Sequence, residues 1–332
     1  MRPPFPINAM LMCAAAVLVS AAQAQTPAPL KQIATVALPN VAGRIDHLAF
    51  DAQRRRLYVA ALGNDTVEVV DAAGNTHLKS LPGFHEPQGI AVAADFGAVA
   101  VANGDTGTLQ LLDAETFATR WTVDVGGDAD NVRYDAAAKQ LYVAAEGGLY
   151  RADPASGKVA RQIKIDGHPE SFQLEAGGTR VFANLPGALS SQVVVGDREA
   201  EAVVSRWSSL GCRSNYPMAL DEMAMRLFIG CRSPARLAVL DSRSGEVKAS
   251  ADVVGDTDDL FLDAARQRAY VIGGEGFVDV LQRRADAIER TTRVATRAGA
   301  RTGLWVPAAS RLYVAVPARD GNGAEVRVFE AQ

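Results

Sequence analysis

Short runs of alternating apolar and polar residues recur along the chain, and they predict β-strands. One set consists of Leu48-Ala49-Phe50, then Leu57-Tyr58-Val59-Ala60-Ala61, then Val67-Glu68-Val69-Val70-Asp71. β-Branched and aromatic residues fill these runs, while Gly, Asn and Asp separate them, which is typical of strands and tight turns. Helical periodicity is absent from the sequence. The pattern therefore predicts an all-β protein.

The three-strand pattern repeats, and the repeat predicts the architecture. The positions equivalent to His47, just before the apolar part of each first strand, are His47, Gly89, Asn131, Ser171, Pro217, Asp259 and Gly303. They lie 40 to 46 residues apart, and a more polar fourth strand follows the third, as in Arg120-Trp121-Thr122-Val123-Asp124. Four short strands in a repeat of this length are typical of a β-propeller blade. We predict a seven-bladed β-propeller with four antiparallel strands in each blade.

The two ends of the repeat array predict how the ring closes. The last unit has a third strand near Val326, but the chain stops at Gln332 without a fourth. A spare strand, Ile33 to Leu38, precedes the first unit. Supplying this strand to the last blade would remove an open sheet edge.

The strand sequences also resemble a known repeat. Leu57 to Asp71 resembles the YVTN repeat, in which a Tyr-Val strand, a Gly-Asn turn and a Val-rich strand ending in Asp recur. Val99 to Asp113 is a second copy and Leu141 to Asp153 a looser one. The chain from residue 25 onward resembles exported bacterial YVTN-type propellers, which are related in fold to lactonase-like propellers. The resemblance implies the fold, but a fold shared by many proteins does not imply one reaction.

The first residues resemble a leader for export. Arg2 precedes an apolar run from Ala9 to Ala22, and Ala22-Gln23-Ala24 has the small-residue spacing of a cleavage site. We therefore expect a signal peptide over residues 1–24, cut after Ala24. The apolar run is too short for a lasting membrane span. Residues 25–332 are then expected to form a single propeller domain in the periplasm or outside the cell.

Composition and charge narrow the range of partners. The 332-residue chain is 48% hydrophobic, carries a formal charge of −4 and has no run of five Lys or Arg residues. Binding to nucleic acid depends on such a basic patch, so we expect no nucleic-acid partner. We expect a monomer that binds a small molecule or a protein.

Two cysteines remain after the expected cleavage, Cys212 and Cys231. An oxidising compartment favours a disulfide, and two cysteines alone cannot make a four-ligand zinc site. Met218 to Asp221 and Arg226 to Gly230 are expected to pair as a hairpin, which places both cysteines at the same end. We predict a disulfide that closes a loop of roughly 20 residues; the alternative is two buried thiols.

The starts of the first strands should converge at one mouth of the central channel. The pairs there are Asp46-His47, Gln88-Gly89, Asp130-Asn131, Glu170-Ser171, Tyr216-Pro217, Asp258-Asp259 and Thr302-Gly303. Neighbouring loops add further polar groups. The candidate ligand-binding residues are Arg44, Asp46, His47, His85, Asp130, Asn131, His168, Glu170, Asp258, Asp259, Arg301, Arg232 and Glu275.

This set supports two interpretations. Carboxylates around a ring provide the oxygen ligands of Ca²⁺, and histidines shift the preference towards a metal such as Zn²⁺. The candidate metal ligands are Asp46, His47, Asp130, Glu170 and Asp258. Alternatively, the acids cap strand ends and bond to neighbouring blades, with Arg44 and Arg301 neutralising them. Lactonase-like propellers hold a central metal. The resemblance suggests a metal in this chain by analogy, and it assigns no ligand.

Two hypotheses for function follow. The chain has no Cys-x-x-Cys-His haem motif, Gly-x-Ser-x-Gly elbow, Walker loop or dinucleotide fingerprint. The first hypothesis is a binding or scaffold module that presents a polar, acidic channel mouth. The second is a metal-dependent, lactonase-like hydrolase with His47 or His168 as general base. The sequence assigns no catalytic residue and leaves open whether the protein is an enzyme.

Overall fold

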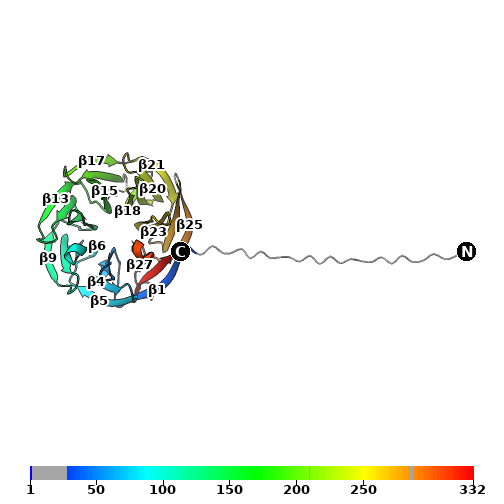
Figure 1. Ribbon diagram of the computed structural model, residues 1–332, viewed down its shortest axis with the longest axis horizontal. Helices are drawn as coiled ribbons and strands as arrows, with labels where there is room; N and C mark the ends of the chain where they lie inside the picture. The colour runs from blue at the N-terminus through cyan, green and yellow to red at the C-terminus, as the bar shows by residue number, and fades with distance from the viewer. Residues whose placement is uncertain (2–27, 188, 209, 285–286) are drawn as a thin grey trace.

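Seven four-stranded antiparallel sheets surround a central channel, as Figure 1 shows. The computed structural model describes residues 1, 28–187, 189–208, 210–284 and 287–332. It confirms the predicted seven-bladed propeller. The expected signal peptide, residues 1–24, lies outside the described residues except for its first one. No helix in the described ranges is long and apolar enough to cross a membrane.

Consecutive strands form each of the first six blades, from the channel outwards. Blade one holds β2 (Leu48–Asp51), β3 (Arg56–Ala61), β4 (Thr66–Asp71) and β5 (Thr76–Pro82). Blade two holds β6 (Pro87–Ala93), β7 (Ala98–Asn103), β8 (Thr108–Asp113) and β9 (Thr119–Asp124). Blade three holds β10 (Val132–Asp135), β11 (Gln140–Ala145), β12 (Gly148–Ala152) and β13 (Val159–Lys164). Blade four holds β14 (Phe172–Leu174), β15 (Arg180–Leu185), β16 (Gln192–Asp197) and β17 (Ala202–Trp207).

The remaining blades follow the same order until the ring closes. Blade five holds β18 (Arg213–Asp221), β19 (Arg226–Ser233), β20 (Ala235–Asp241) and β21 (Val247–Asp252). Blade six holds β22 (Thr257–Asp263), β23 (Arg268–Gly273), β24 (Phe277–Arg284) and β25 (Ala287–Ala295). Blade seven holds β26 (Gly303–Val306), β27 (Arg311–Val316), β28 (Ala324–Ala331) and β1 (Leu30–Leu38). Three single-turn 3-10 helices occupy turns, namely η1 (Leu62–Asn64), η2 (Ala94–Phe96) and η3 (Pro307–Ala309).

Burial along the strands explains the layering of each blade. In β3 every residue after the first is buried, because both faces of this strand pack against neighbouring blades. In the outermost β5 most residues are exposed. The apolar clusters lie between blades: Val36 and Leu38 of blade seven pack with Leu57 and Val59 of blade one. The hydrophobic core is therefore a ring of inter-blade layers around the channel.

The ring closes as predicted. β1 pairs antiparallel with β28, from Leu30 opposite Ala331 to Leu38 opposite Ala324, with a bulge between Gln32 and Ala34. The backbone N–H of Gln332 donates to the carbonyl of Pro29 at 3.1 Å. The first and last strands of the described chain thus form the outer half of a single blade.

The acids that end many strands have a structural role. Asp71 accepts hydrogen bonds from the backbone N–H groups of Ala73 and Gly74. Asp113, Asp197 and Asp241 make the same two bonds to their own turns. Each carboxylate satisfies turn N–H groups that no strand can pair. These acids lie away from the channel mouth, and their recurrence reflects the turn that each blade needs.

The disulfide between Cys212 and Cys231 is present, as predicted. The Cα atoms are 6.0 Å apart and 19 residues separate the two cysteines in sequence. Both strands of the hairpin are longer than the sequence indicated: β18 starts at Arg213 and β19 continues to Ser233. A bulge between Asn215 and Met218 interrupts their register, which is why the apolar alternation did not extend that far.

Candidate functional site

The predicted residue pairs converge at one opening of the channel. A cavity of about 430 Å³, here called the mouth pocket, is formed by loops that lead into the innermost strands and by neighbouring loops. Its lining residues are Arg44, Leu62, Glu86, Gln88, Asp128, Asp130, His168, Glu170, Tyr216, Arg232 and Asp258. Six of the candidate residues therefore share one pocket, although they come from five blades.

A glycine in blade two allows this convergence. A Cβ atom on Gly89 would lie 2.2 Å from the carbonyl oxygen of Asp130 and 2.9 Å from Cα of Asn131. No other residue type leaves the two backbones so close. The equivalent position is His47 in blade one and Asp259 in blade six, so the glycine reflects local crowding. It lets the start of blade two pack directly against the backbone at the start of blade three.

Arginines neutralise one side of the mouth pocket, which we call the arginine half. Arg44 Nη2 lies 2.8 Å from Asp46 Oδ2 and 3.6 Å from Asp258 Oδ2. Arg232 Nη2 lies 2.6 Å from Asp258 Oδ1. The Arg232 guanidinium also stacks on Tyr216, 3.6 Å from the ring centroid. Each buried carboxylate on this side therefore has a guanidinium partner.

The pKa shifts agree with these ion pairs. The carboxylate of Asp46 raises the pKa of Arg44 above its ordinary value, while burial acts in the opposite direction. Burial raises the pKa of Asp258, and the guanidinium of Arg232 partly offsets that rise. One oxygen of Asp46 and one of Asp258 are buried without a hydrogen-bond partner in the described structure. The arginine half is thus charged and incompletely hydrogen-bonded.

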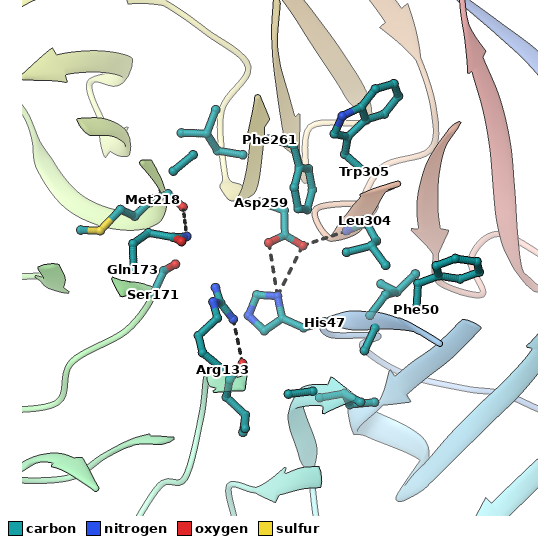
Figure 2. Close-up of a pocket in the computed structure, with 18 of the residues that line it drawn as sticks. His47, Phe50, Arg133, Ser171, Gln173, Met218, Asp259, Phe261, Leu304 and Trp305 are labelled. Carbon is teal, nitrogen blue, oxygen red and sulfur yellow. Dashed lines mark hydrogen bonds and ion pairs between the residues drawn. The ribbon is translucent and has the colours of Figure 1, made fainter. Parts of the chain in front are cut away.

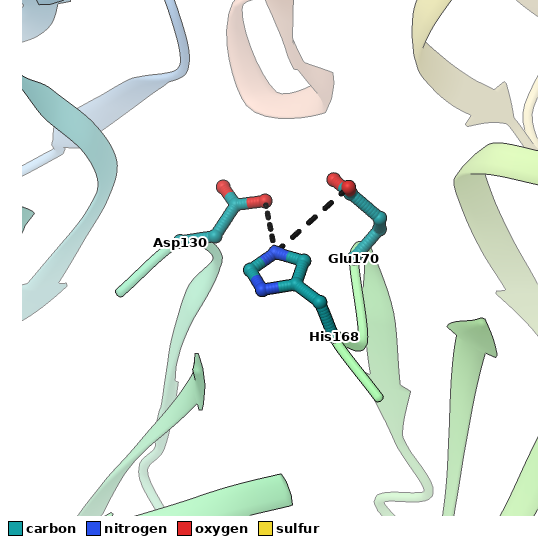
Figure 3. A group of neighbouring side chains, drawn as sticks. All are labelled: Asp130, His168 and Glu170. Atoms are coloured by element: carbon teal, nitrogen blue, oxygen red, sulfur yellow. Dashed lines mark ion pairs between the residues drawn. The ribbon is translucent and has the colours of Figure 1, made fainter. Parts of the chain in front are cut away.

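The other side of the pocket, the acidic half, consists of Asp130, His168 and Glu170 (Figure 3). His168 Nε2 lies 3.7 Å from Asp130 Oδ2 and 3.8 Å from Glu170 Oε1. One ligand atom from each residue fits within a group in which all separations are at most 4.8 Å. Asp128 adjoins the group, with Oδ2 3.6 Å from His168 Nδ1. This group could hold a metal ion.

The three titratable groups of the acidic half have shifted pKa values, and the shifts differ in direction. Burial and the nearby Asp130 carboxylate raise the pKa of Glu170 strongly. Burial opposes ionisation of Asp130 as well, but hydrogen bonding to His168 and Glu170 outweighs it and lowers the pKa of Asp130. Burial also acts against protonation of His168, yet Asp130 raises its pKa. Without a bound cation, burial and mutual repulsion therefore favour one proton shared between Glu170 and Asp130.

His47 lies below the mouth pocket, in a layer that crosses the channel. Its Nδ1 is 3.3 Å from Asp259 Oδ1 (Figure 2), and its Nε2 is 3.1 Å from the amide nitrogen of Asn131. Burial disfavours the imidazolium, but the carboxylates of Asp259 and Asp46 raise the pKa of His47 to about 10. A protonated ring needs an acceptor at this point, and a half-turn of the Asn131 amide would offer its oxygen, which has no hydrogen-bond partner among the described residues. We call His47, Asn131 and Asp259 the crossing layer.

Three further candidate residues lie outside the mouth pocket, the arginine half and the crossing layer. His85 is exposed, and its backbone N–H donates to Asn103 Oδ1 at 3.1 Å. Arg301 Nη2 is 3.1 Å from Asp256 Oδ2, so it neutralises a loop acid rather than the acids of the pocket. Glu275 accepts a hydrogen bond from the backbone of Gly255. These contacts hold neighbouring loops of the same face together.

The sequence-based metal set is divided by the structure. Asp130 and Glu170 join His168 in the acidic half. Asp46 and Asp258 pair with arginines, and His47 pairs with Asp259 in the crossing layer. Arginines thus neutralise the acids in the arginine half of the mouth. Among the described residues, a metal ion could be held only in the acidic half.

Five lining residues are not among the candidates, and two of them, Asp128 and Tyr216, contact candidate residues directly. Tyr216 stands in one of the seven predicted pairs, but it carries no charge, and the candidate set favours charged residues. Asp128 precedes the Asp130-Asn131 pair by two residues and lies in the same loop. An aromatic residue at a mouth position and a second acid in a mouth loop are the signals that identify them.

Comparison with known proteins supports the fold. No protein-family model matches the chain. A chain of the crystal structure of the mitotic checkpoint complex superposes with a TM-score of 0.75 at 11% identity, covering 96% of this chain and 99% of that one. A chain of hydrazine synthase from Kuenenia stuttgartiensis gives a TM-score of 0.76 at 16% identity, covering 86% and 97%. Identities this low show the propeller fold alone.

One curated relative shares part of the sequence. The uncharacterised protein YwhL of Bacillus subtilis strain 168 is 31% identical over 126 residues, which is 38% of this chain. The match spans 27% of that protein's length.

Proposed function

We propose that the protein is an exported binding propeller of the YVTN, lactonase-like type. Its mouth pocket would bind a divalent cation and a small polar ligand that the cation coordinates. The pocket supports this proposal because it is concave and gathers polar groups from several blades, as ligand sites do. Export, family membership and a periplasmic or secreted location belong to the proposal and rest on the leader-like first 24 residues and the repeat.

The acidic half is the observation that carries the proposal. Within the described structure, no arginine forms an ion pair with Asp130 or Glu170. Two buried carboxyl groups held together repel unless a proton or a cation lies between them. A divalent cation would replace the shared proton, and Asp130, Glu170 and His168 would supply one ligand atom each. The exposed face of Arg44 would then contact an anionic part of the ligand.

A metal-dependent, lactonase-like hydrolase is the second candidate function. Three protein ligands leave coordination positions open for water and substrate, which is typical of catalytic metal sites. A cation held there would polarise the carbonyl of a lactone or ester. His47 cannot serve as general base for a substrate in the mouth pocket, because the crossing layer holds its ring against Asp259. His168 lines the pocket, but it could act as the base only if Asp130 and Glu170 held the cation without it.

Metal binding tests both functions. We expect protein purified without chelators to bind Ca²⁺ or Zn²⁺ at one site by isothermal titration calorimetry. Asp130→Asn and Glu170→Gln should each weaken binding by about tenfold or more, since each removes a charged ligand. Glu275→Gln is the matched control: it makes the same change on the same face, outside the pocket, and should leave affinity unchanged.

Turnover separates the two functions. Hydrolysis of lactones or esters that EDTA abolishes and that fails in Glu170→Gln would establish the hydrolase. Cation binding without turnover would support the binding propeller. Protein that binds neither CaCl₂ nor ZnCl₂ at millimolar concentration would contradict both.

A further inference from the structure

A second cavity lies in the channel itself, on the other side of the crossing layer from the mouth pocket. This channel cavity of about 500 Å³ follows the innermost strands of all seven blades. Many of its lining side chains are apolar, among them Phe50, Phe261 and Leu304 (Figure 2), but polar atoms form more than half of the exposed wall. A cavity of this size and character is within the range of small-molecule sites. It shares His47 and Asp259 with the crossing layer and none of the residues of the acidic half.

Besides His47 and Asp259 of the crossing layer, one further charged side chain lies among these apolar residues. Arg133 stands two residues after the start position of blade three, and it lines the channel cavity. The corresponding residues of the other blades are Ala49, Ala91, Gln173, Ala219, Phe261 and Trp305. An arginine in a column of mainly small and apolar residues is not needed to close the ring, because six blades close without one.

Arg133 has no acidic partner. Its Nη1 donates to the carbonyl of Val132 at 3.0 Å, and its guanidinium lies 5.5 Å from the centroid of the Phe172 ring. No carboxylate of the described residues lies within ion-pair distance of it. Nearby Asp259 is already engaged, because it contacts His47 and accepts the N–H of Gly303 at 2.8 Å.

An unpaired guanidinium in this position would be stabilised by an anion. Burial lowers the pKa of Arg133, and the more distant Asp259 and Asp130 act against that shift; arginine nevertheless remains charged at neutral pH. Removing such a charge from water costs free energy that a counter-ion restores. The Ser171 hydroxyl lines the same cavity and makes no hydrogen bond within the described structure. Two donors are thus available to one anionic group.

We propose that the channel cavity binds a small organic carboxylate with an alkyl or aryl body. The carboxylate would accept hydrogen bonds from Arg133 and Ser171, and the apolar body would pack against Phe261 and Leu304. A planar guanidinium matches a carboxylate through two parallel hydrogen bonds. The apolar side chains would favour such a ligand over inorganic anions, because they replace water around its body. This site is independent of the proposed cation site.

Calorimetric titration with two pairs of probes tests the proposal. Benzoate and hexanoate should bind the protein at least about tenfold more tightly than benzamide and hexanamide, which lack the charge. Arg133→Gln should abolish that preference, and Arg133→Lys should keep part of it. Arg213→Gln is the matched control, since Arg213 is exposed and has no ion-pair partner among the described residues; it should bind as the unaltered protein does.

Two further variants test whether benzoate binds in the channel cavity. Leu304→Trp narrows the channel cavity and should abolish benzoate binding, whereas Glu170→Gln alters only the mouth pocket and should leave it intact. Melting temperatures identify any variant that fails to fold, and the comparison of carboxylates with amides on the unaltered protein does not depend on a variant. Absence of saturable carboxylate binding, equal binding of the amides, or full binding by a folded Arg133→Gln protein would overturn the proposal.

Discussion

Arg232 shows how a single side chain organises the channel mouth. Its Nη2 pairs with Asp258, its Nε donates to the carbonyl of Thr257 at 3.0 Å, and its plane covers Tyr216. A planar guanidinium can form a directed ion pair and stack on an aromatic ring at the same time. Arg232 therefore ties blade five to blade six and removes the need for a cation at Asp258.

His47 makes a pH-dependent contribution to stability that can be measured. Its pKa is raised to about 10 from the ordinary value near 6.5, so the folded protein holds a proton that the unfolded chain releases. The stabilisation is complete below pH 6.5 and is lost as the pH rises through 10. We expect the free energy of unfolding to fall between these values, by at most about 1.4 kcal/mol per pH unit for one proton.

Urea denaturation at several pH values, with two variants, isolates this contribution. His47→Gln keeps a hydrogen-bonding side chain next to Asp259 but cannot titrate, so its stability should fall less steeply above pH 7. His85→Gln should retain the full slope, because His85 is exposed in a loop. Equal slopes in all three proteins would show that His47 is not an imidazolium in the folded state.

The site residues illustrate what a repeat can and cannot predict. Alignment of the blades places Asp46, Asp130, Glu170 and Asp258 at one mouth, because equivalent positions in a propeller face the same opening. It cannot predict that Arg44 contacts Asp258, more than 200 residues away, since that depends on loop conformation and rotamers. Arg133 differs in charge from every equivalent residue of the other blades, so the aligned sequence alone marks this channel-wall position as unusual.

At the scale of the element, the β18–β19 hairpin shows the same contrast. Alternation and turn residues predicted the hairpin, its pairing and the proximity of its two cysteines. They did not predict that the strands extend to Arg213 and Ser233, because the bulge after Asn215 changes which face each side chain occupies. A pattern of period two identifies a strand only while the register is regular.

The disulfide should contribute to the stability of this hairpin and blade. A closed loop of roughly 20 residues restricts the unfolded chain and stabilises the fold by about 3 kcal/mol in the loop-entropy account. We expect reduction, or replacement of Cys212 and Cys231 by alanine, to lower the free energy of unfolding by about that amount in urea titrations. Reductant should not change the alanine variant further, which serves as the control.

Thiol titration gives a direct check. Protein that begins at residue 25 and is unfolded without reductant should expose no free thiol, and after reduction it should expose both cysteines. Two reactive thiols before reduction would contradict the disulfide.

At the scale of the whole molecule, the propeller depends on one long-range pairing. The first six blades form from consecutive strands, but blade seven needs β1 and β28 to meet. The inward side of β1 places Leu30, Val36 and Leu38 in the core, each at most 3% exposed. Full burial of each such side chain stabilises a fold by about 1.5–3 kcal/mol. Closure therefore contributes a large share of a typical domain stability.

Substitutions within β1 test this closure quantitatively. Leu38→Ala should lower the free energy of unfolding by about 2–5 kcal/mol, because it leaves a cavity between blades seven and one. Ile33 lies at the bulge of the same strand and is 38% exposed, so Ile33→Ala should cost less than about 0.5 kcal/mol. Similar losses for the two variants in urea denaturation would show that β1 is not packed as described.

A circular permutant tests whether β1 stabilises the fold by pairing with β28. The alternative is that the fold needs these residues at the N-terminal end of the chain. Deleting residues 28–39 should expose the edge of β28 and lead to association or unfolding. Because Gln332 and Pro29 are hydrogen-bonded neighbours, a short linker can join residue 332 to residue 28 while the chain opens in the turn at residues 72–75. In the permutant, β1 follows β28 directly in the chain and can pair with it as the second strand of a hairpin. It should fold as a monomer near native stability, and failure to fold would mean that closure requires more than this pairing.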